Sequence, residues 1–282
     1  MLEYNGMSAA SAVVMSRILR KKKIIFVEGL HEGKLLENIF DGEIIAISAG
    51  GCNGVIEAVD TLKMYNDKNT THISVIGFID IDYLHIKDDK SILQRNDIIY
   101  TTYRDIEIDL IHSKSLRRYL EEKANPLKWD SEIKVANELL DSLKGLSYQR
   151  AYNYAFSKNW DFKWINISNY STRDGDIDYD KLTSAFRQKN RINDAGWKSY
   201  IKWKNEKQIC LKMITRGHDA TCLLGVKLQK KFGNRSKEES DQLVVEENLR
   251  LAVERKFIEA YNWFIRILQW TTSIAPVREI IV

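Results

Sequence analysis

Three acidic residues in the first third of the chain have the spacing of a metal site. Glu28 directly follows the apolar run 24–27, and Asp80 and Asp82 end the longer apolar run 73–81. Residues two apart on a strand point to the same face, so we expect the two aspartates to converge. Carboxylates that share one place repel one another unless a cation lies among them, and oxygen ligands favour Mg²⁺ or Mn²⁺ over Zn²⁺. We therefore predict that Glu28, Asp80 and Asp82 hold a divalent metal; the alternative is that the two aspartates only end a strand and cap the next loop.

Short apolar runs alternate with amphipathic segments around these acids. The pattern predicts strands over 24–27, 43–47, 73–81 and 97–100, and helices over 31–40 and 55–65. Two successive strand–helix–strand units indicate an α/β fold, with a parallel sheet and helices on both of its faces. Ligand sites in such sheets gather at the carboxyl ends of the strands, where we expect Glu28 to lie beside the aspartates.

A glycine-rich loop, 50–54, joins the second predicted strand to the next helix. Backbone N–H groups at a helix start can hold a phosphate, which makes Gly51 a candidate phosphate contact. The glycines could equally serve only to make a tight turn. The loop lacks the GxGxxG spacing of nicotinamide sites, and residues 29–35 lack the glycine spacing of a P-loop, so neither cofactor is predicted.

The features of the first third together resemble the Toprim domain of topoisomerases, primases and OLD-family nucleases. The matching residues are 25–29 (IFVEG), Gly50-Gly51 and Asp80-Ile81-Asp82, and the resemblance covers roughly residues 22–112. It implies a Toprim-like sheet and Mg²⁺-dependent chemistry on nucleic acid. Glu32 stands where members of the family often carry a second acid. His85 stands where glycine is common, which weakens a specific topoisomerase or primase assignment.

The chain is also similar to a narrower group, the compact Toprim proteins encoded beside ABC-type ATPases in bacterial defence loci. The Toprim effector of the PARIS anti-phage system belongs to this group. The similarity rests on the early start of the Toprim part and on residues 103–110 (YRDIEIDL) and 216–219 (RGHD). It implies a nuclease that an ATPase partner restrains and infection releases. Its substrate would be RNA, including tRNA, or DNA, and a homodimer is one form that the active nuclease could take.

Two residues of these short segments have two interpretations each. Glu107 is a candidate fourth carboxylate of the catalytic site, but the helix dipole also favours an acid in the first turn of a helix. His218 is a candidate phosphate contact, and its alternative role is in the start and packing of the helix predicted over 220–231.

Long periodic segments replace short strands in the rest of the chain. Helices are predicted over 115–124, 131–156, 181–189 and 220–231, and one long helix over 238–270. A strand is predicted over 161–167 and a solvated loop over 169–180. We therefore expect a Toprim-like catalytic domain over 1–112 and a mostly helical domain over 113–282 that binds nucleic acid, a partner or both.

Charge is distributed unevenly along the chain. The formal net charge is only +4, but residues 181–216 contain ten basic and two acidic residues with aromatic residues between them. Cations neutralise phosphates, and aromatic faces stack on unpaired bases. The predicted nucleic-acid contacts are Arg191, Lys198, Lys202, Trp203 and Lys204. The alternative is an amphipathic helix with Trp197, Tyr200 and Ile201 packed inward.

Composition excludes several other classes of protein. The three cysteines are far apart and form no CxxC, so neither a disulfide scaffold nor a structural zinc site is predicted. No apolar run reaches the roughly 18 residues of a membrane span, and the N-terminus lacks the pattern of a signal peptide. We expect a cytoplasmic protein without a membrane partner.

The carboxylates indicate a metal-assisted reaction at phosphorus, the resemblance implies a Mg²⁺-dependent endonuclease, and two other functions stay open. One is a DxD phosphatase or phosphotransferase, although Tyr83 follows the motif where that chemistry usually has a small hydroxyl or glycine. The other is a non-catalytic regulatory module that uses a Toprim fold to dock on an ATPase.

Overall fold

The chain folds into two units. The computed structural model describes residues 5–70, 72–86, 91–233 and 235–273. The first unit takes the described residues of 1–81, 90–102 and 254–282, and the second those of 82–89 and 103–253. This division differs from the expected boundary at residue 112, because 103–112 join the helical unit and the last helices join the unit that holds the sheet.

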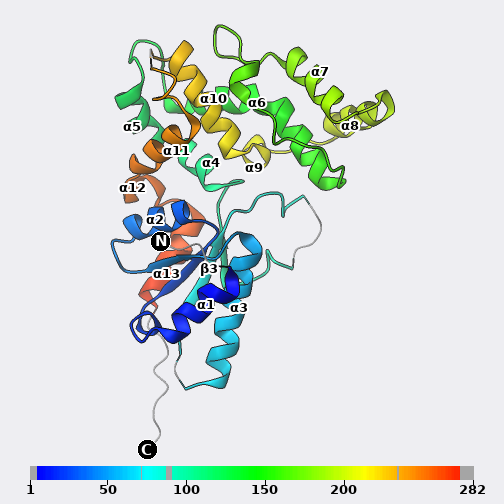
Figure 1. The fold of residues 1–282 in the computed structure, drawn as a ribbon. Coiled ribbons are helices and arrows are strands. Elements are labelled where there is room, and N and C mark those ends of the chain that lie inside the picture. Colours follow the sequence, from blue (N-terminus) through cyan, green and yellow to red (C-terminus); the bar gives the residue numbers. More distant parts are fainter. Residues whose placement is uncertain (1–4, 71, 87–90, 234, 274–282) are drawn as a thin grey trace, which may run out of the picture. The chain divides into compact units, whose positions relative to one another are not determined.

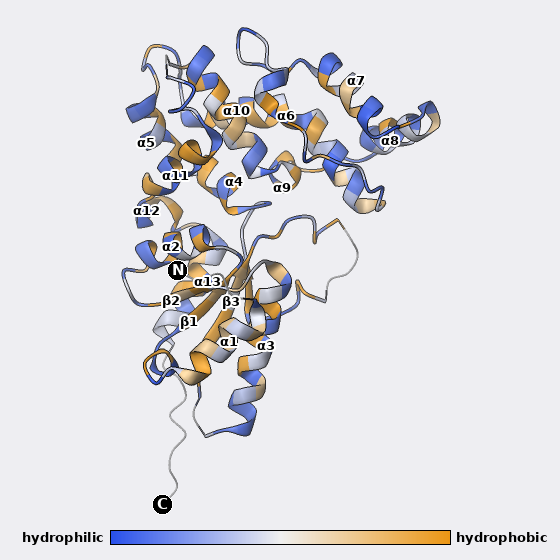
Figure 2. Cartoon of the chain, in the orientation of Figure 1, coloured by the Kyte–Doolittle hydropathy of each residue, from blue (hydrophilic) through white to orange (hydrophobic). Residues whose placement is uncertain are grey.

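The first unit is built on four parallel strands. They are β1 (Ile24–Val27), β2 (Ile45–Ser48), β3 (Val75–Ile79) and β4 (Ile98–Tyr100), in the order β2-β1-β3-β4. Figure 2 shows these strands as almost uniformly apolar, which is typical of parallel strands covered on both faces. The predicted α/β class with a parallel sheet and a mostly helical C-terminal region is therefore confirmed.

Helices cover both faces of this sheet (Figure 1). Helix α2 (Leu30–Ile39) leads from β1 to β2, and α3 (Cys52–Lys68) leads from β2 past β1 to β3. The two connections run in opposite directions across the sheet, so their common right-handedness places the two helices on opposite faces. Helix α1 (Gly6–Met15), which the sequence did not predict, packs on α3. The short 3₁₀ turn η1 (Leu19–Lys21) then leads into β1.

The prediction of one helix over 238–270 was wrong. The chain forms α11 (Gln242–Leu251) in the second unit, then α12 (Arg255–Ile258) and α13 (Asn262–Thr272) in the first. The backbone is extended at Glu254, where α12 begins, and again at Tyr261, where α13 begins, so the segment cannot form one continuous helix. Trp263 and Phe264 of α13 pack in the first unit against Phe78 and Phe40, with ring centroids 5.5 and 5.2 Å apart.

The second unit is helical. Its elements before α11 are α4 (Ile106–Ile111), α5 (Lys114–Lys123), α6 (Glu132–Ala155), η2 (Ile167–Tyr170), α7 (Tyr179–Lys189), α8 (Asp194–Glu206), α9 (Leu211–Ile214) and α10 (Gly217–Lys230). Helix α10 is central, with contacts to α4, α6, η2 and α11. The strand predicted over 161–167 is absent from this described segment, which forms turns and the start of η2.

None of the helices in the described parts of the chain combines the length and the apolar composition that a membrane crossing requires.

Candidate functional site

Glu28 and Asp80 meet at the carboxyl edge of the sheet in the first unit. Each directly follows its strand, and these two strands, β1 and β3, are neighbours. One carboxylate oxygen of Glu28 accepts the backbone N–H of Asp80 at 3.0 Å. The carbonyl oxygen of Glu28 accepts the Gly51 N–H at 2.9 Å. Parallel pairing and the glycine turn thus place the Glu28 side chain beside Asp80, as the sequence predicts.

The turn at Gly50 and Gly51 positions a backbone N–H that binds the Glu28 carbonyl. Gly50 and Gly51 have positive φ angles of 76° and 90°, a conformation that glycine adopts without strain. The turn lets the Gly51 N–H reach the Glu28 carbonyl, so this N–H already has a partner. The structure therefore favours the tight-turn interpretation of Gly51 over the phosphate contact.

Glu32 adds a third carboxylate to this edge of the first unit. It lies in the first turn of α2, and its carboxylate folds back over Gly29, where a β-carbon would be only 2.7 Å from Glu32 Oε2. Gly29 follows Glu28 directly, which brings the Glu32 side chain close to the backbone of the predicted metal ligand.

The argument that strand alternation aligns Asp82 with Asp80 was wrong. Strand β3 ends at Ile79, and Asp82 has a left-handed backbone with φ 45°. In the second unit, the Asp82 carboxylate lies 3.3 Å from a guanidinium nitrogen of Arg104, and its backbone N–H donates to the Arg104 carbonyl at 2.8 Å. The side chain is 55% exposed, so it remains accessible to solvent while it faces Arg104.

Glu107 is buried in α4 and belongs to an ion-pair network of the second unit. Its carboxylate lies 2.6 Å from Nη2 of Arg250, which also approaches Glu246 at 3.5 Å. The neighbouring N-cap residue Asp105 accepts the Gly217 N–H at 2.7 Å. Burial and the charge of Glu107 raise the pKa of Asp105 to about 7.

His218 is held by Glu246 at the start of α10. Its Nδ1 lies 2.6 Å from the Glu246 carboxylate, which also accepts from Thr221 and Gln242 at 2.9 Å. The hydrogen bond with Glu246 raises the pKa of His218. Burial alone would raise the pKa of Glu246, but its hydrogen bonds from His218 and Gln242 lower that pKa to about 2.

The oxygen donors in the first unit suit Mg²⁺ or Mn²⁺. Glu28, Asp80 and Glu32 supply carboxylates at one edge of the sheet, and such hard donors favour these ions. No group of three or more His, Cys, Asp or Glu side chains within the described ranges has the arrangement of a complete metal site. Asp82 and Glu107, two further predicted site acids, face arginines of the second unit.

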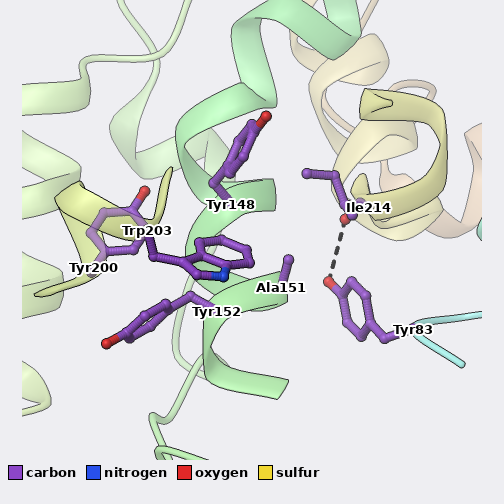
Figure 3. Packing of buried hydrophobic residues seen from close by; sticks show 7 residues of the cluster. All are labelled: Tyr83, Tyr148, Ala151, Tyr152, Tyr200, Trp203 and Ile214. Atoms are coloured by element: carbon purple, nitrogen blue, oxygen red, sulfur yellow. Dashed lines mark hydrogen bonds between the residues drawn. The ribbon is translucent and has the colours of Figure 1, made fainter. Parts of the chain in front are cut away.

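The predicted nucleic-acid contacts separate into exposed and buried residues. Lys198 and Lys202 on α8 and Arg191 before it are exposed, and Lys204 is half-buried. Trp203 is 9% exposed and packs against Tyr148 and Tyr152 at ring-centroid distances of 6.0 and 5.4 Å. Figure 3 shows the indole inside this cluster. The prediction that Trp203 offers a stacking face was therefore wrong, because its ring already packs in the core.

Tyr200 lies in the same cluster as Trp203 and is 1% exposed, which fits the inward-packing alternative. Trp197 is half-buried, with its ring 4.8 Å from that of Tyr200 and the Arg187 guanidinium 5.3 Å above it.

Sequence reasoning missed the arginines that engage the acids. Arg104 faces Asp82, and Arg250 forms an ion pair with Glu107. Arg150 donates two hydrogen bonds, of 2.7 and 3.0 Å, to the Asp219 carboxylate. Arg104 stands inside the 103–110 segment and could have been weighed there. Arg250 lies 143 residues from Glu107, so no local spacing could indicate that pair.

Neither a protein-family model nor a curated protein matches this sequence.

Proposed function

We propose that the chain is a metal-dependent nuclease whose reacting centre is built on Glu28 and Asp80. The contact between these acids at the ends of adjacent parallel strands supports the proposal, because α/β sheets bind their ligands at this edge. The carboxylates of Glu28 and Asp80 would hold Mg²⁺ or Mn²⁺, with Glu32 beside them. A bound ion would supply charge neutralisation at the scissile phosphate and a lowered pKa for the attacking water.

The protein residues have separate roles in this hydrolysis. Glu28 is fixed through its backbone carbonyl and its side chain, so its carboxylate keeps a constant position beside Asp80. Glu32 can orient a water next to Glu28. Water forms the new bond to phosphorus, the bond to the leaving sugar oxygen breaks, and that oxygen takes up a proton.

The substrate in this proposal is a nucleic-acid strand held by its phosphates. Lys198 and Lys202 are four residues apart, so they lie on one face of α8, and both are exposed. RNA such as tRNA, an ABC-type ATPase that restrains the nuclease and a role in anti-phage defence are proposed from the resemblance in the 103–110 and 216–219 segments.

The decisive experiment compares matched carboxylate variants. Wild type, Glu28→Gln and the exposed control Glu43→Gln are incubated with tRNA and with duplex DNA, with Mn²⁺ or with EDTA. We expect Mn²⁺-dependent cleavage by wild type and by the control, and at least about 100-fold slower cleavage by Glu28→Gln. Equal rates for wild type and Glu28→Gln would show that the assignment of Glu28 is wrong.

The Asp82–Arg104 and Glu107–Arg250 pairs favour a second candidate, a non-catalytic regulatory module that docks on an ATPase. In this alternative the paired acids stabilise the second unit and bind no metal. Isothermal titration with Mn²⁺ separates the candidates even when a preparation does not cleave. Saturable binding that Glu28→Gln removes supports the nuclease, whereas wild type without measurable binding supports the regulatory module.

A further inference from the structure

The second unit contains a cavity of about 550 Å³ whose walls come from three segments. They are residues 162–168, residues 216–229 at the start of and along α10, and residues 237–242. Pockets for small molecules range from about 300 to 1,000 Å³, so a ligand the size of one nucleotide fits this volume.

Positive charge on the cavity wall exceeds negative charge. Lys163, Arg216 and Lys237 each come from a different wall segment, and among the residues described none of the three forms an ion pair. The acid Asp219 is neutralised by its two-point contact with Arg150. Asp241, the other acid of the wall, accepts the Leu243 N–H at 3.0 Å as the N-cap of α11. The surplus charge suits an anion.

A buried hydroxyl belongs to a residue of the same wall. Ser240 is 5% exposed, and its Oγ makes no hydrogen bond with any residue in the described part of the chain. An unsatisfied buried hydroxyl costs free energy, and rotation of the Ser240 side chain toward a ligand oxygen in the cavity would relieve that cost. His218 lies on the same wall, where Glu246 fixes its ring.

The rest of the wall is less polar. Phe162, Ile165, Ile167 and Val226 line the cavity. The Phe162 ring is held in place by contacts with the Arg150 guanidinium, at 4.7 Å, and with the Phe186 ring, at 4.9 Å. An apolar side beside a cationic wall matches a ligand that carries both a flat ring and a phosphate.

We propose that this cavity binds a nucleoside monophosphate, with its phosphate on Arg216, His218 and Ser240 and its base against the Phe162 side. The nucleotide can be free, or it can be the phosphorylated end of a strand, since both offer the same chemistry. The proposal does not depend on nuclease activity, because binding of this nucleotide requires neither a metal nor the Glu28 carboxylate.

Binding is measured by isothermal titration calorimetry in EDTA, with AMP and UMP as probes and adenosine and inorganic phosphate as partial ligands. Arg216→Gln should weaken AMP binding by at least about 10-fold, because one charged hydrogen bond is lost. Ser240→Ala should weaken it by about 5-fold, the effect of one neutral hydrogen bond. Arg216 makes no side-chain cap bond to α10, so its replacement should leave the fold intact. The matched control Arg117→Gln, on the exposed face of α5, should bind as wild type does.

A tetranucleotide with and without a 5′-phosphate distinguishes the two sources. Tighter binding of the phosphorylated strand identifies a strand end, and binding of AMP alone identifies a free nucleotide; either result supports the proposal. It is overturned by three results: no saturable binding of AMP or UMP at millimolar concentration, AMP affinity unchanged in Arg216→Gln, or inorganic phosphate binding as tightly as AMP.

Discussion

Replacing Arg250 with methionine should loosen the second unit, because one guanidinium serves two buried carboxylates. Arg250 is 12% exposed, and its Nη2 lies 2.6 Å from Glu107 and 3.5 Å from Glu246, which are 6% and 3% exposed. Methionine fills a similar length but leaves both acids without this cation. Stability should therefore fall through uncompensated charge and not through lost volume.

The size of the stability loss depends on which of the two acids is left without a partner. Removing one partner of a buried pair costs about 3–5 kcal/mol. Glu246 keeps its hydrogen bonds with His218, Thr221 and Gln242, so most of the cost falls on Glu107. Only Glu107 loses its one side-chain partner within the described ranges, while Glu246 keeps others, so we expect the lower end of the interval, about 3 kcal/mol.

Hydrogen exchange followed by mass spectrometry tests this figure locally, because stability differs between parts of a structure. A loss of about 3 kcal/mol corresponds to exchange on the order of 100-fold faster in peptides from α4 and α11. Peptides from β1 in the first unit serve as the internal reference. The control Arg117→Met removes an exposed i, i+4 contact with Glu121 and should change nothing measurable.

A second substitution separates uncompensated charge from poor packing. Replacing both partners of a buried pair with apolar residues is often neutral. The double variant Arg250→Met with Glu107→Leu should therefore exchange more slowly than the single variant. If Arg250→Met exchanges at the wild-type rate, or if the double variant is no better than the single one, the uncompensated-charge explanation fails.

Three further results are expected from other parts of the molecule. Gly54→Ala should lower the melting temperature by several degrees, since a methyl group would overlap the Ala49 carbonyl and overpacking costs about 1–3 kcal/mol. Trp203→Ala should cost about 3–5 kcal/mol in urea unfolding, because its indole fills the aromatic cluster. The third result concerns pH. The lowered pKa of Glu246 means that its carboxylate stabilises the fold above pH 4.5, and that this contribution is lost as pH falls toward 2. The raised pKa of His218 means that its charged ring stabilises the fold below pH 6.5, and that this contribution is lost as pH rises. Urea midpoints should therefore differ most between wild type and Glu246→Gln from about pH 4.5 to 6.5.

The sheet could be predicted because its signals are local. The first strand was predicted over 24–27, and β1 is Ile24–Val27, four buried apolar residues that end at an acid and a glycine. Parallel pairing then follows from the strand–helix–strand order, and it brings the end of β1, with Glu28, next to Asp80 at the end of β3. This half of the candidate site was accessible from the sequence.

The rest of the site depends on contacts distant in sequence and on single dihedral angles. The left-handed turn at Asp82 has no glycine or asparagine to indicate it, so strand alternation was extended two residues too far. The partners of Glu107 and His218 lie on α11, inside the segment predicted as one long helix. Periodicity could not show where that helix stops, because its apolar spacing continues through the extended residue Glu254.

The basic segment 181–216 shows how the period of a helix decides which side chains can reach a nucleic acid. Its composition alone allows both phosphate binding and base stacking. Lysines and aromatic residues alternate in the sequence, which suggested a surface that both neutralises phosphates and stacks bases. On α8, Lys198 and Lys202 occupy one exposed face, while Tyr200 and Trp203 lie on the face that packs in the core. If α8 binds nucleic acid as we propose, that binding must be electrostatic and largely independent of base sequence. For a single strand, the salt dependence of affinity should lose a slope of about 0.7 for each phosphate-contacting lysine replaced by glutamine. Base-specific binding by this helix would require Trp203 to leave the cluster, at the cost of the contacts that stabilise the second unit.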